Sequence, residues 1–531
     1  MRPPKAFGVV PRSMALALAV LLSAAVGCGG GGSSGGSPVA APPTSPAPPT
    51  PAPSPSPTPS PTPTPSPTPS PTAPAAFPLT ASANQRYLQD QNGTPFPILG
   101  RTAWFITSLA EADYRTFIDD TAAKGYNAIE FMVITHHPNG NQPPFGAGTA
   151  RLLPFTKRLD GSAWTGSLSY SVPTAEAPDF SQPNEAFWLH IDGLLSYAES
   201  KGILCFAFPA YVGFQGGNQG WMLEMTANGS TKINAYGAFL ANRYKGRGNI
   251  VWMLGGDFGT GGALFNAQQL DRENAMLAGL KSVAGQQSLN FSAEWNSESI
   301  YTDQPDPTLK AAGTLQGAYS FNGDVNTQAR RGYSSSPAMP TFLLEEPYDE
   351  EGPDGNGVNG AATQPVRRFQ WWGWFSGIGG YMSGNGFVWP FNTGVWQNHL
   401  NTQGAQDMVR LNAFARSISW QNLVPSGLGG MKVLVTAGGS TPAASNYVAA
   451  AATPDGTLLV AYVPPAHSGS ITIDMTVMSK PARARWLNPA SGAGLFTLIG
   501  TGIANTGPVV FTPPANNGSG FSDWVLVLDT P

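Results

Sequence analysis

The fold is decided by the stretch Ile250-Val251-Trp252-Met253-Leu254-Gly255-Gly256-Asp257, a continuous apolar run that ends in two glycines and a carboxylate. The later stretch Thr341-Phe342-Leu343-Leu344-Glu345-Glu346-Pro347-Tyr348 has the same form. Unbroken apolar runs of this length are typical of strands that are buried on both faces of a parallel sheet. Both stretches therefore predict strands of an α/β domain, each with carboxylates at its C-terminal end.

Further runs of the same kind surround these two. In chain order, the eight predicted strands are Ile98–Gly100, Asn127–Ile134, Ile203–Phe208, Ile250–Leu254, Leu289–Ser292, Gly317–Ser320, Thr341–Leu344 and Gly379–Met382. Helical patterns lie between most of them, at Glu111–Lys124, Glu185–Lys201, Lys232–Tyr244, Ala267–Val283 and Thr363–Phe375. Eight strands that alternate with helices predict a (β/α)8 TIM barrel, which we assign to residues 79–428. A hairpin with an Asn92-Gly93 turn is expected just before the first strand.

The chain after Pro425 has a different pattern. Seven short strand-like runs are separated by turns rich in Gly, Pro and Asn. They are Lys432–Thr436, Tyr447–Ala451, Leu458–Val463, Ile471–Met475, Ala484–Leu487, Val509–Phe511 and Trp524–Leu528. Short strands at this spacing predict a small all-β sandwich domain, which we assign to residues 429–531.

The N-terminal region has the features of an export signal followed by a spacer. Residues 1–28 combine early basic residues, an apolar run too short to span a membrane, and the sequence Ala25-Val26-Gly27-Cys28. This sequence resembles a bacterial lipoprotein cleavage box, which predicts lipidation of Cys28; a plain secretory signal is the alternative. Residues 29–78 are Gly-, Pro-, Ser- and Thr-rich and predict a disordered linker. We expect an exported protein that is lipid-anchored at the outer surface or in the periplasm, or secreted.

Composition narrows the range of partners. The chain has 531 residues, a net charge of −4 and only 11% charged residues, so it lacks the basic surface that nucleic-acid binding requires. It contains no metal-binding or nucleotide-binding motif, and we expect neither a metal nor another cofactor. The 14 Trp residues suit a surface that binds neutral, hydroxyl-rich ligands. The expected partner is an oligosaccharide or polysaccharide substrate, the expected state is a monomer, and the only expected membrane contact is the lipid anchor.

Carboxylates at the ends of two predicted strands indicate the chemistry. Asp257 follows the fourth strand, and Glu345 and Glu346 end the seventh, which lies across the barrel mouth from the fourth. Glycoside cleavage needs two carboxyl groups, one to protonate the leaving oxygen and one to attack or to activate water. Consecutive strand residues point in opposite directions, so either Glu345 or Glu346 can face the site, but not both. The acids Glu130, Glu294 and Asp349 are lesser candidates.

Aromatic and amide residues gather at the same strand ends. Sugar rings stack on indoles, and amides reach sugar hydroxyls. The candidate substrate-binding residues of this kind are Trp104, Trp221, Trp295, Asn296, Tyr348 and Trp389. The residues Trp371, Trp372 and Trp374 lie in a helical pattern and are expected in the core.

Several short motifs together resemble the apiosidase-like glycoside hydrolases, known as family 140 or domain of unknown function 4038. They include Leu99-Gly100-Arg101-Thr102-Ala103-Trp104, Pro183-Asn184-Glu185-Ala186-Phe187-Trp188, Gly255-Gly256-Asp257, Glu346-Pro347-Tyr348 and Trp420-Gln421-Asn422-Leu423-Val424-Pro425. The tail, with Arg485-Trp486-Leu487-Asn488-Pro489, resembles the small domain that usually follows, which carries a collagen-binding label.

The resemblance implies exo-acting removal of a terminal sugar from pectin-like plant glycans. The family's acid/base Asp falls on Asp257, and its second catalytic acid, a Glu before Pro, falls on Glu346, as nucleophile or base. Arg101 stands where the family usually has Asp, which implies a different sugar preference, such as an acidic sugar. A non-catalytic glycan- or matrix-binding surface lipoprotein is the alternative function, and an inverting hydrolase or a transglycosylase is a third.

Overall fold

The computed structural model describes residues 74–136, 152–166, 176–259, 264–321, 325–351, 366–391, 395–491 and 496–530. The predicted signal, with Cys28, and the linker up to residue 73 lie outside these residues. None of the described helices is long and apolar enough to cross a membrane.

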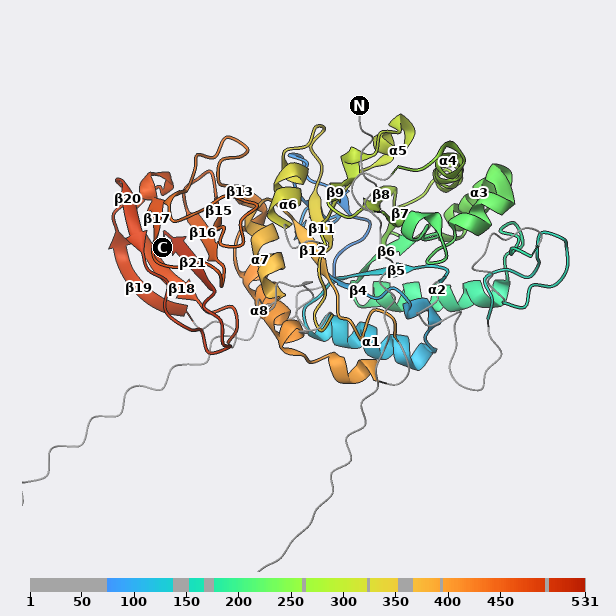
Figure 1. Ribbon diagram of the computed structural model, residues 1–531, viewed down its shortest axis with the longest axis horizontal. Helices are drawn as coiled ribbons and strands as arrows, with labels where there is room; N and C mark the ends of the chain where they lie inside the picture. The colour runs from blue at the N-terminus through green and yellow to red at the C-terminus, as the bar shows by residue number, and fades with distance from the viewer. Residues whose placement is uncertain are drawn as a thin grey trace, which may run out of the picture. The chain divides into compact units, whose positions relative to one another are not determined.

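Eight parallel strands form the barrel (Figure 1). They are β4 (Ile98–Thr102), β5 (Ala128–Met132), β6 (Leu204–Phe208), β7 (Ile250–Gly259), β8 (Asn290–Asn296), β10 (Gln316–Tyr319), β11 (Thr341–Glu345) and β12 (Gly380–Ser383). Their order is β8-β7-β6-β5-β4-β12-β11-β10, and each predicted strand corresponds to one of them. Backbone bonds from Thr314 and Leu315 to the Phe291 carbonyl join the two ends of this sheet. The (β/α)8 prediction is confirmed.

Helices cover the outside of the strands (Figure 1). They are α1 (Glu111–Ala123), α2 (Glu185–Ser200), α3 (Met222–Tyr244), α4 (Ala267–Lys281), α5 (Pro307–Ala312), α6 (Val325–Tyr333), α7 (Arg367–Phe375) and α8 (Gln403–Ser417). Five correspond to predicted helices, although α3 begins ten residues earlier than expected. Helices α5, α6 and α8 were not predicted, nor was the short strand β9 (Ser299–Ile300), which pairs antiparallel with β10.

The expected N-terminal hairpin is present as β2 (Leu88–Gln89) and β3 (Pro95–Phe96), with β1 (Thr80–Ala81) beside it. Gly93 adopts a φ of 77° in the turn. The end of the predicted linker belongs to the folded part, because the Ala76 carbonyl accepts a bond from Gln91 and Phe77 packs against the barrel core.

The C-terminal domain contains two antiparallel sheets. The larger has the order β13-β15-β16-β21-β18-β19 and the smaller β14-β17-β20. Their strands are β13 (Val424–Pro425), β14 (Val435–Ala437), β15 (Ala449–Ala452), β16 (Leu458–Val463), β17 (Ile471–Asp474), β18 (Ala482–Leu487), β19 (Phe496–Ile503), β20 (Pro508–Phe511) and β21 (Trp524–Asp529). The all-β prediction is confirmed, with β13 and β19 as unpredicted strands; β13 lies within the residues assigned to the barrel but pairs with β15. One apolar cluster contains both Leu343 and Trp371 of the barrel and Tyr462 and Val527 of the β-domain, so the two share a core.

Candidate active site

The end of β7 has a backbone that favours glycine. Gly255 and Gly256 have φ values of 73° and 129°, and a Cβ atom on Gly256 would lie 2.4 Å from the ring of Tyr211. Asp257 follows with a φ of 38°, a left-handed conformation that costs a non-glycine residue on the order of 1–3 kcal/mol. Strain of this kind is typical of functional sites. The local backbone conformation therefore places Asp257 at the barrel mouth, where its side chain is partly exposed.

Tyr319, at the end of β10, lies beside two carboxyl groups. Its hydroxyl donates to Asp257 Oδ1 over 3.1 Å, and burial together with the charges of Glu345, the last residue of β11, and of Asp257 raises the pKa of the phenol. Tyr348 donates a phenolic bond to Glu345 Oε1. Burial and then the charge of Asp257 raise the pKa of Glu345 to about 8, while burial also raises the pKa of Asp257. The two carboxyl groups interact directly, so they titrate as a pair that holds a proton at neutral pH.

Two further buried carboxyl groups lie beside this pair. Glu294, from β8, accepts a 3.1 Å hydrogen bond from Tyr211, and Glu130, from β5, is fully buried. Burial raises the pKa of both well above the usual range, and the charge of Glu345 raises it further. The mouth of the barrel thus collects acids from four strands, and they cannot all be ionised at neutral pH.

Glu346 does not have the environment that the resemblance implies. Its carboxyl group is fully buried and accepts a hydrogen bond from Gln370 of helix α7, which covers the outside of β11. Neighbouring strand residues alternate between the two faces of the sheet, so Glu345 points into the barrel and Glu346 toward the helix. The glutamate on which the charge of Asp257 acts is therefore Glu345, and the catalytic role of Glu346 stays a prediction of the resemblance.

Trp104 and Tyr348 form a wall of the site. Trp104 Nε1 donates to the Tyr348 hydroxyl over 2.8 Å, and its ring lies 5.4 Å from those of Phe208 and Tyr211. Both predicted residues lie beside Glu345, but they are almost completely buried. The Tyr348 hydroxyl orients Glu345 through its hydrogen bond. The two buried rings do not present a broad surface on which a sugar could stack.

Arg101 belongs to the outside of the barrel. Its guanidinium forms a 2.7 Å ion pair with Asp120 of α1 and lies over the rings of Phe117 and Tyr126. None of its charged partners is a carboxyl group of the barrel mouth. The side chain of Arg101 therefore faces the helix, and its contact with substrate and its selection of an acidic sugar stay predictions.

Trp221 is also a core residue and not a substrate platform. Only 1% of its surface is exposed, its Nε1 donates to the Ile134 carbonyl over 3.0 Å, and its ring packs edge-on against His136 and Phe180. Trp389 is half-buried and packs 6.0 Å from Phe105. No described contact joins either indole to Asp257 or Glu345.

Trp295 and Asn296 line a cavity of about 190 Å³ beside the ends of β7 and β8. Phe258 and Phe265 form its apolar wall, and Glu298 contributes a carboxylate. These aromatic and polar walls have the chemistry that a sugar ring requires. Its lining includes Phe258, which follows Asp257 in the chain, and Trp295, which follows Glu294.

The remaining candidates lie elsewhere. Asp349 accepts bonds from Thr402 and Asn385, away from the central pair. His136 is buried 3.2 Å from Glu224, and His137 lies outside the described residues. Within the described part of the chain, no group of three or more His, Cys, Asp or Glu residues is placed to hold a metal ion. Cys205 is a buried free thiol.

Sequence reasoning missed Tyr211 and Tyr319, two of the three phenols that bond the acids. Tyr319 had a usable signal, because it ends a predicted barrel strand at the edge where active sites form. Tyr211 had none, since it lies in the loop after β6 and reaches Glu294 only through the close approach to Gly256.

This geometry defines a class of enzyme. Solved structures of the same fold include a protein described as a glycoside hydrolase (18% identity, TM-score 0.64, aligned over 86% of this chain and 98% of that one). A glycoside hydrolase family 5 protein from Bacteroides vulgatus is similar to the same degree (18% identity, TM-score 0.65, 86% and 95% coverage). At this level of identity the likeness establishes the TIM-barrel fold. A comparison with curated protein sequences finds no match.

Residues 82–422 match the family described as "Apiosidase-like, catalytic domain", and the chain belongs to that family. Residues 436–529 match the family described as "Putative collagen-binding domain of a collagenase". The protein is a glycosidase, and the reading as a non-catalytic surface lipoprotein is set aside.

Proposed function

We propose that the protein removes a terminal sugar from a pectin-like plant glycan, with Asp257 and Glu345 as its catalytic carboxyl groups. The observation that carries this proposal is the pair of acids at the mouth of the barrel: Tyr319 donates to Asp257, Tyr348 donates to Glu345, and burial and the charge of Asp257 raise the pKa of Glu345. Exo-action and the pectic substrate are part of the proposal and are supported only by the resemblance to the apiosidase-like family.

In this mechanism Asp257 protonates the leaving oxygen and Glu345 attacks the anomeric carbon. Asp257 is only partly buried, so it can exchange protons with water between the two steps. Glu345 carries the proton of the pair in the free enzyme, and in this mechanism that proton passes to Asp257 when substrate binds. The bond that Glu345 accepts from Tyr348 then stabilises its carboxylate form. Since the pair holds one proton at neutral pH, it provides one acid and one base at the same time. Loss of that proton above pH 8 lowers the rate.

The cavity beside Trp295 and Asn296 is the proposed site for the sugar unit next to the cleaved bond. Trp104 and Tyr348 orient Glu345, and Trp389 contacts the substrate at the rim. We further propose that the enzyme is exported and anchored through Cys28, with residues 29–73 as a spacer that reaches an extended polymer.

The test is sugar release by residues 74–531 from pectic and arabinan oligosaccharides, followed by proton NMR. Asp257→Asn and Glu345→Gln each lower the rate by a factor of about 10³ or more, because each removes a group used only in the transition state. Glu346→Gln is the matched control: it keeps most of the activity, because its side chain faces α7 and its amide oxygen can still accept the bond from Gln370.

Full activity in Glu345→Gln together with loss in Glu346→Gln would overturn the assignment of the pair. The anomer that appears first separates the stereochemical alternatives, since retention requires a covalent intermediate on Glu345 and inversion requires a water molecule between the acids. Transfer of the sugar to an added alcohol would indicate a transglycosylase.

A further inference from the structure

We propose that the C-terminal β-domain positions the catalytic glutamate, acting through helix α7. The β-domain has no assigned part in the reaction. This inference rests on the proposed function, because it takes Glu345 as a reacting group. The contacts run from Asp523 of the β-domain to Arg367 and Gln370 of α7 and on to Glu346, the neighbour of Glu345.

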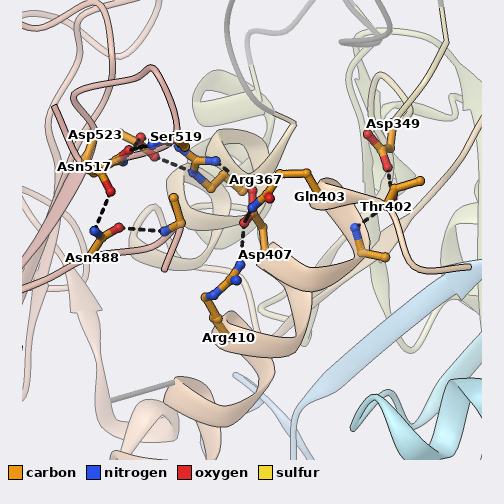
Figure 2. A network of polar contacts seen from close by, with 12 residues as sticks. Asp349, Arg367, Thr402, Gln403, Asp407, Arg410, Asn488, Asn517, Ser519 and Asp523 are labelled. Carbon is orange, nitrogen blue, oxygen red and sulfur yellow. Dashed lines mark hydrogen bonds and ion pairs between the residues drawn. The ribbon is translucent and has the colours of Figure 1, made fainter. Parts of the chain in front are cut away.

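The first step is a buried ion pair between the domains (Figure 2). The Arg367 guanidinium bonds Asp523 through two nitrogens, at 2.8 and 2.6 Å, and Asp407 of α8 at 2.7 Å. All three side chains are at most 1% exposed. Removing one partner from a buried charge pair is strongly destabilising, because the other charge stays uncompensated in the interior. The bidentate contact therefore fixes the position and direction of the first turn of α7.

The second step is the rigid support of Asp523 within the β-domain. Asn517 Nδ2 donates to Asp523 Oδ1 over 2.7 Å, and the Tyr462 hydroxyl donates to Oδ2 over 3.0 Å. Asn488 in turn holds the Asn517 carbonyl over 2.7 Å, as Figure 2 shows. Asp523 is thus held in place by its own domain and presents its carboxylate to α7 without freedom to adjust.

The third step is the burial of α7 on its outer side. All nine residues of this helix are buried, although an outer helix of a barrel normally keeps one polar face in water. Trp371 stacks on Tyr462 with an interplanar angle of 14°, and Trp372 Nε1 donates to the Tyr447 carbonyl over 2.8 Å. Tyr462 and Tyr447 belong to the β-domain, so the β-domain covers the outer face of α7 where solvent would otherwise lie.

The last step joins α7 to the reacting group. Gln370 lies one turn after Arg367 and donates to Glu346 Oε1. Gly373 lies so close to β11 that a Cβ atom there would meet Leu343 at 2.6 Å. A displacement of α7 is therefore passed to the end of β11, and a shift of about 1 Å in a reacting group can cost about a hundredfold in rate.

The experiment is a double-mutant cycle in residues 74–531, with kcat and KM measured on a small soluble substrate. Asp523→Asn and Gln370→Met each lower kcat about tenfold and leave KM within about twofold. The double variant loses clearly less than the hundredfold product, because both changes act on one route. Asp529→Asn, which removes an ion-pair partner of Arg483 inside the β-domain, is the matched control and keeps the wild-type kcat.

Losses that multiply in the double variant, or an unchanged kcat in Asp523→Asn, would overturn the proposal. If Asp523→Asn does not fold, Gln370→Met and its milder partner Gln370→Asn still decide it: equal kcat in both variants and the wild type contradicts positioning. An inactive wild type would instead reject the proposed function, so the two failures are distinguishable.

Discussion

At the residue scale, the raised pKa of Glu345 lowers the free energy of unfolding as the pH rises. Its pKa in the folded protein is about 8, above its usual value of 4.5, because the carboxyl group is buried beside Asp257. Between these two pH values the unfolded chain releases the proton that the folded protein retains. The contribution of Glu345 to stability is therefore complete below about pH 4.5 and is lost as the pH rises through 8.

We predict that the Glu345→Gln variant does not have this decrease in stability between pH 4.5 and pH 8. The variant should be more stable than the wild type at pH 8 by about 1 kcal/mol or more, and the difference should shrink toward pH 4.5. Urea unfolding at both pH values measures it, with the exposed Glu176→Gln as control. A variant that is less stable than the wild type by the same amount at both pH values would contradict the buried, protonated state.

The choice between Glu345 and Glu346 shows how far a sequence motif can assign the role of a single residue. Alternation along the strand requires that only one of the two face the barrel, and that much was predictable. The match to a Glu-Pro motif selected Glu346, whereas the bond from Tyr348 to Glu345 and the bond from Gln370 to Glu346 favour Glu345. The direction of a strand's side chains depends on which face meets the helix, and one motif does not contain that information.

At the element scale, the end of β7 depends on glycine. Gly256 has a φ of 129°, and any Cβ would collide with Tyr211, which bonds Glu294. We predict that Gly256→Ala lowers activity at least tenfold and the free energy of unfolding by roughly 2 kcal/mol. Gly246→Ala, in an exposed turn with open space around it, should leave both unchanged. Kinetics and thermal unfolding of the two variants check this, and an equal outcome for both would contradict it.

The elements also divide by how strongly the sequence specifies them. The eight strands were predicted because each is a continuous apolar run. Helix α6 was missed because Val325–Tyr333 is mainly polar, and β9 because two residues form no pattern. Helix α8 had a usable signal, since Met408, Leu411 and Phe414 recur every three residues.

At the scale of the whole molecule, we predict that the anchor and the enzyme are separate parts. Cys28→Ser should release the protein from the membrane fraction of a bacterial host without changing kcat, because the described barrel begins after residue 73. Fractionation with an activity assay measures this. A wild-type protein found only in the soluble exported fraction would contradict lipidation and favour the plain secretory signal.

The sequence by itself determined the barrel, the β-domain and the presence of an acid at the end of the fourth and of the seventh strand, because burial and strand periodicity are local properties. Only the tertiary structure decided which acids meet, that Arg101 and Trp221 support the scaffold, and that α7 lies between both domains. These are matters of long-range contact: Tyr319 and Asp257, or Arg367 and Asp523, are far apart in the chain and meet only when the elements pack.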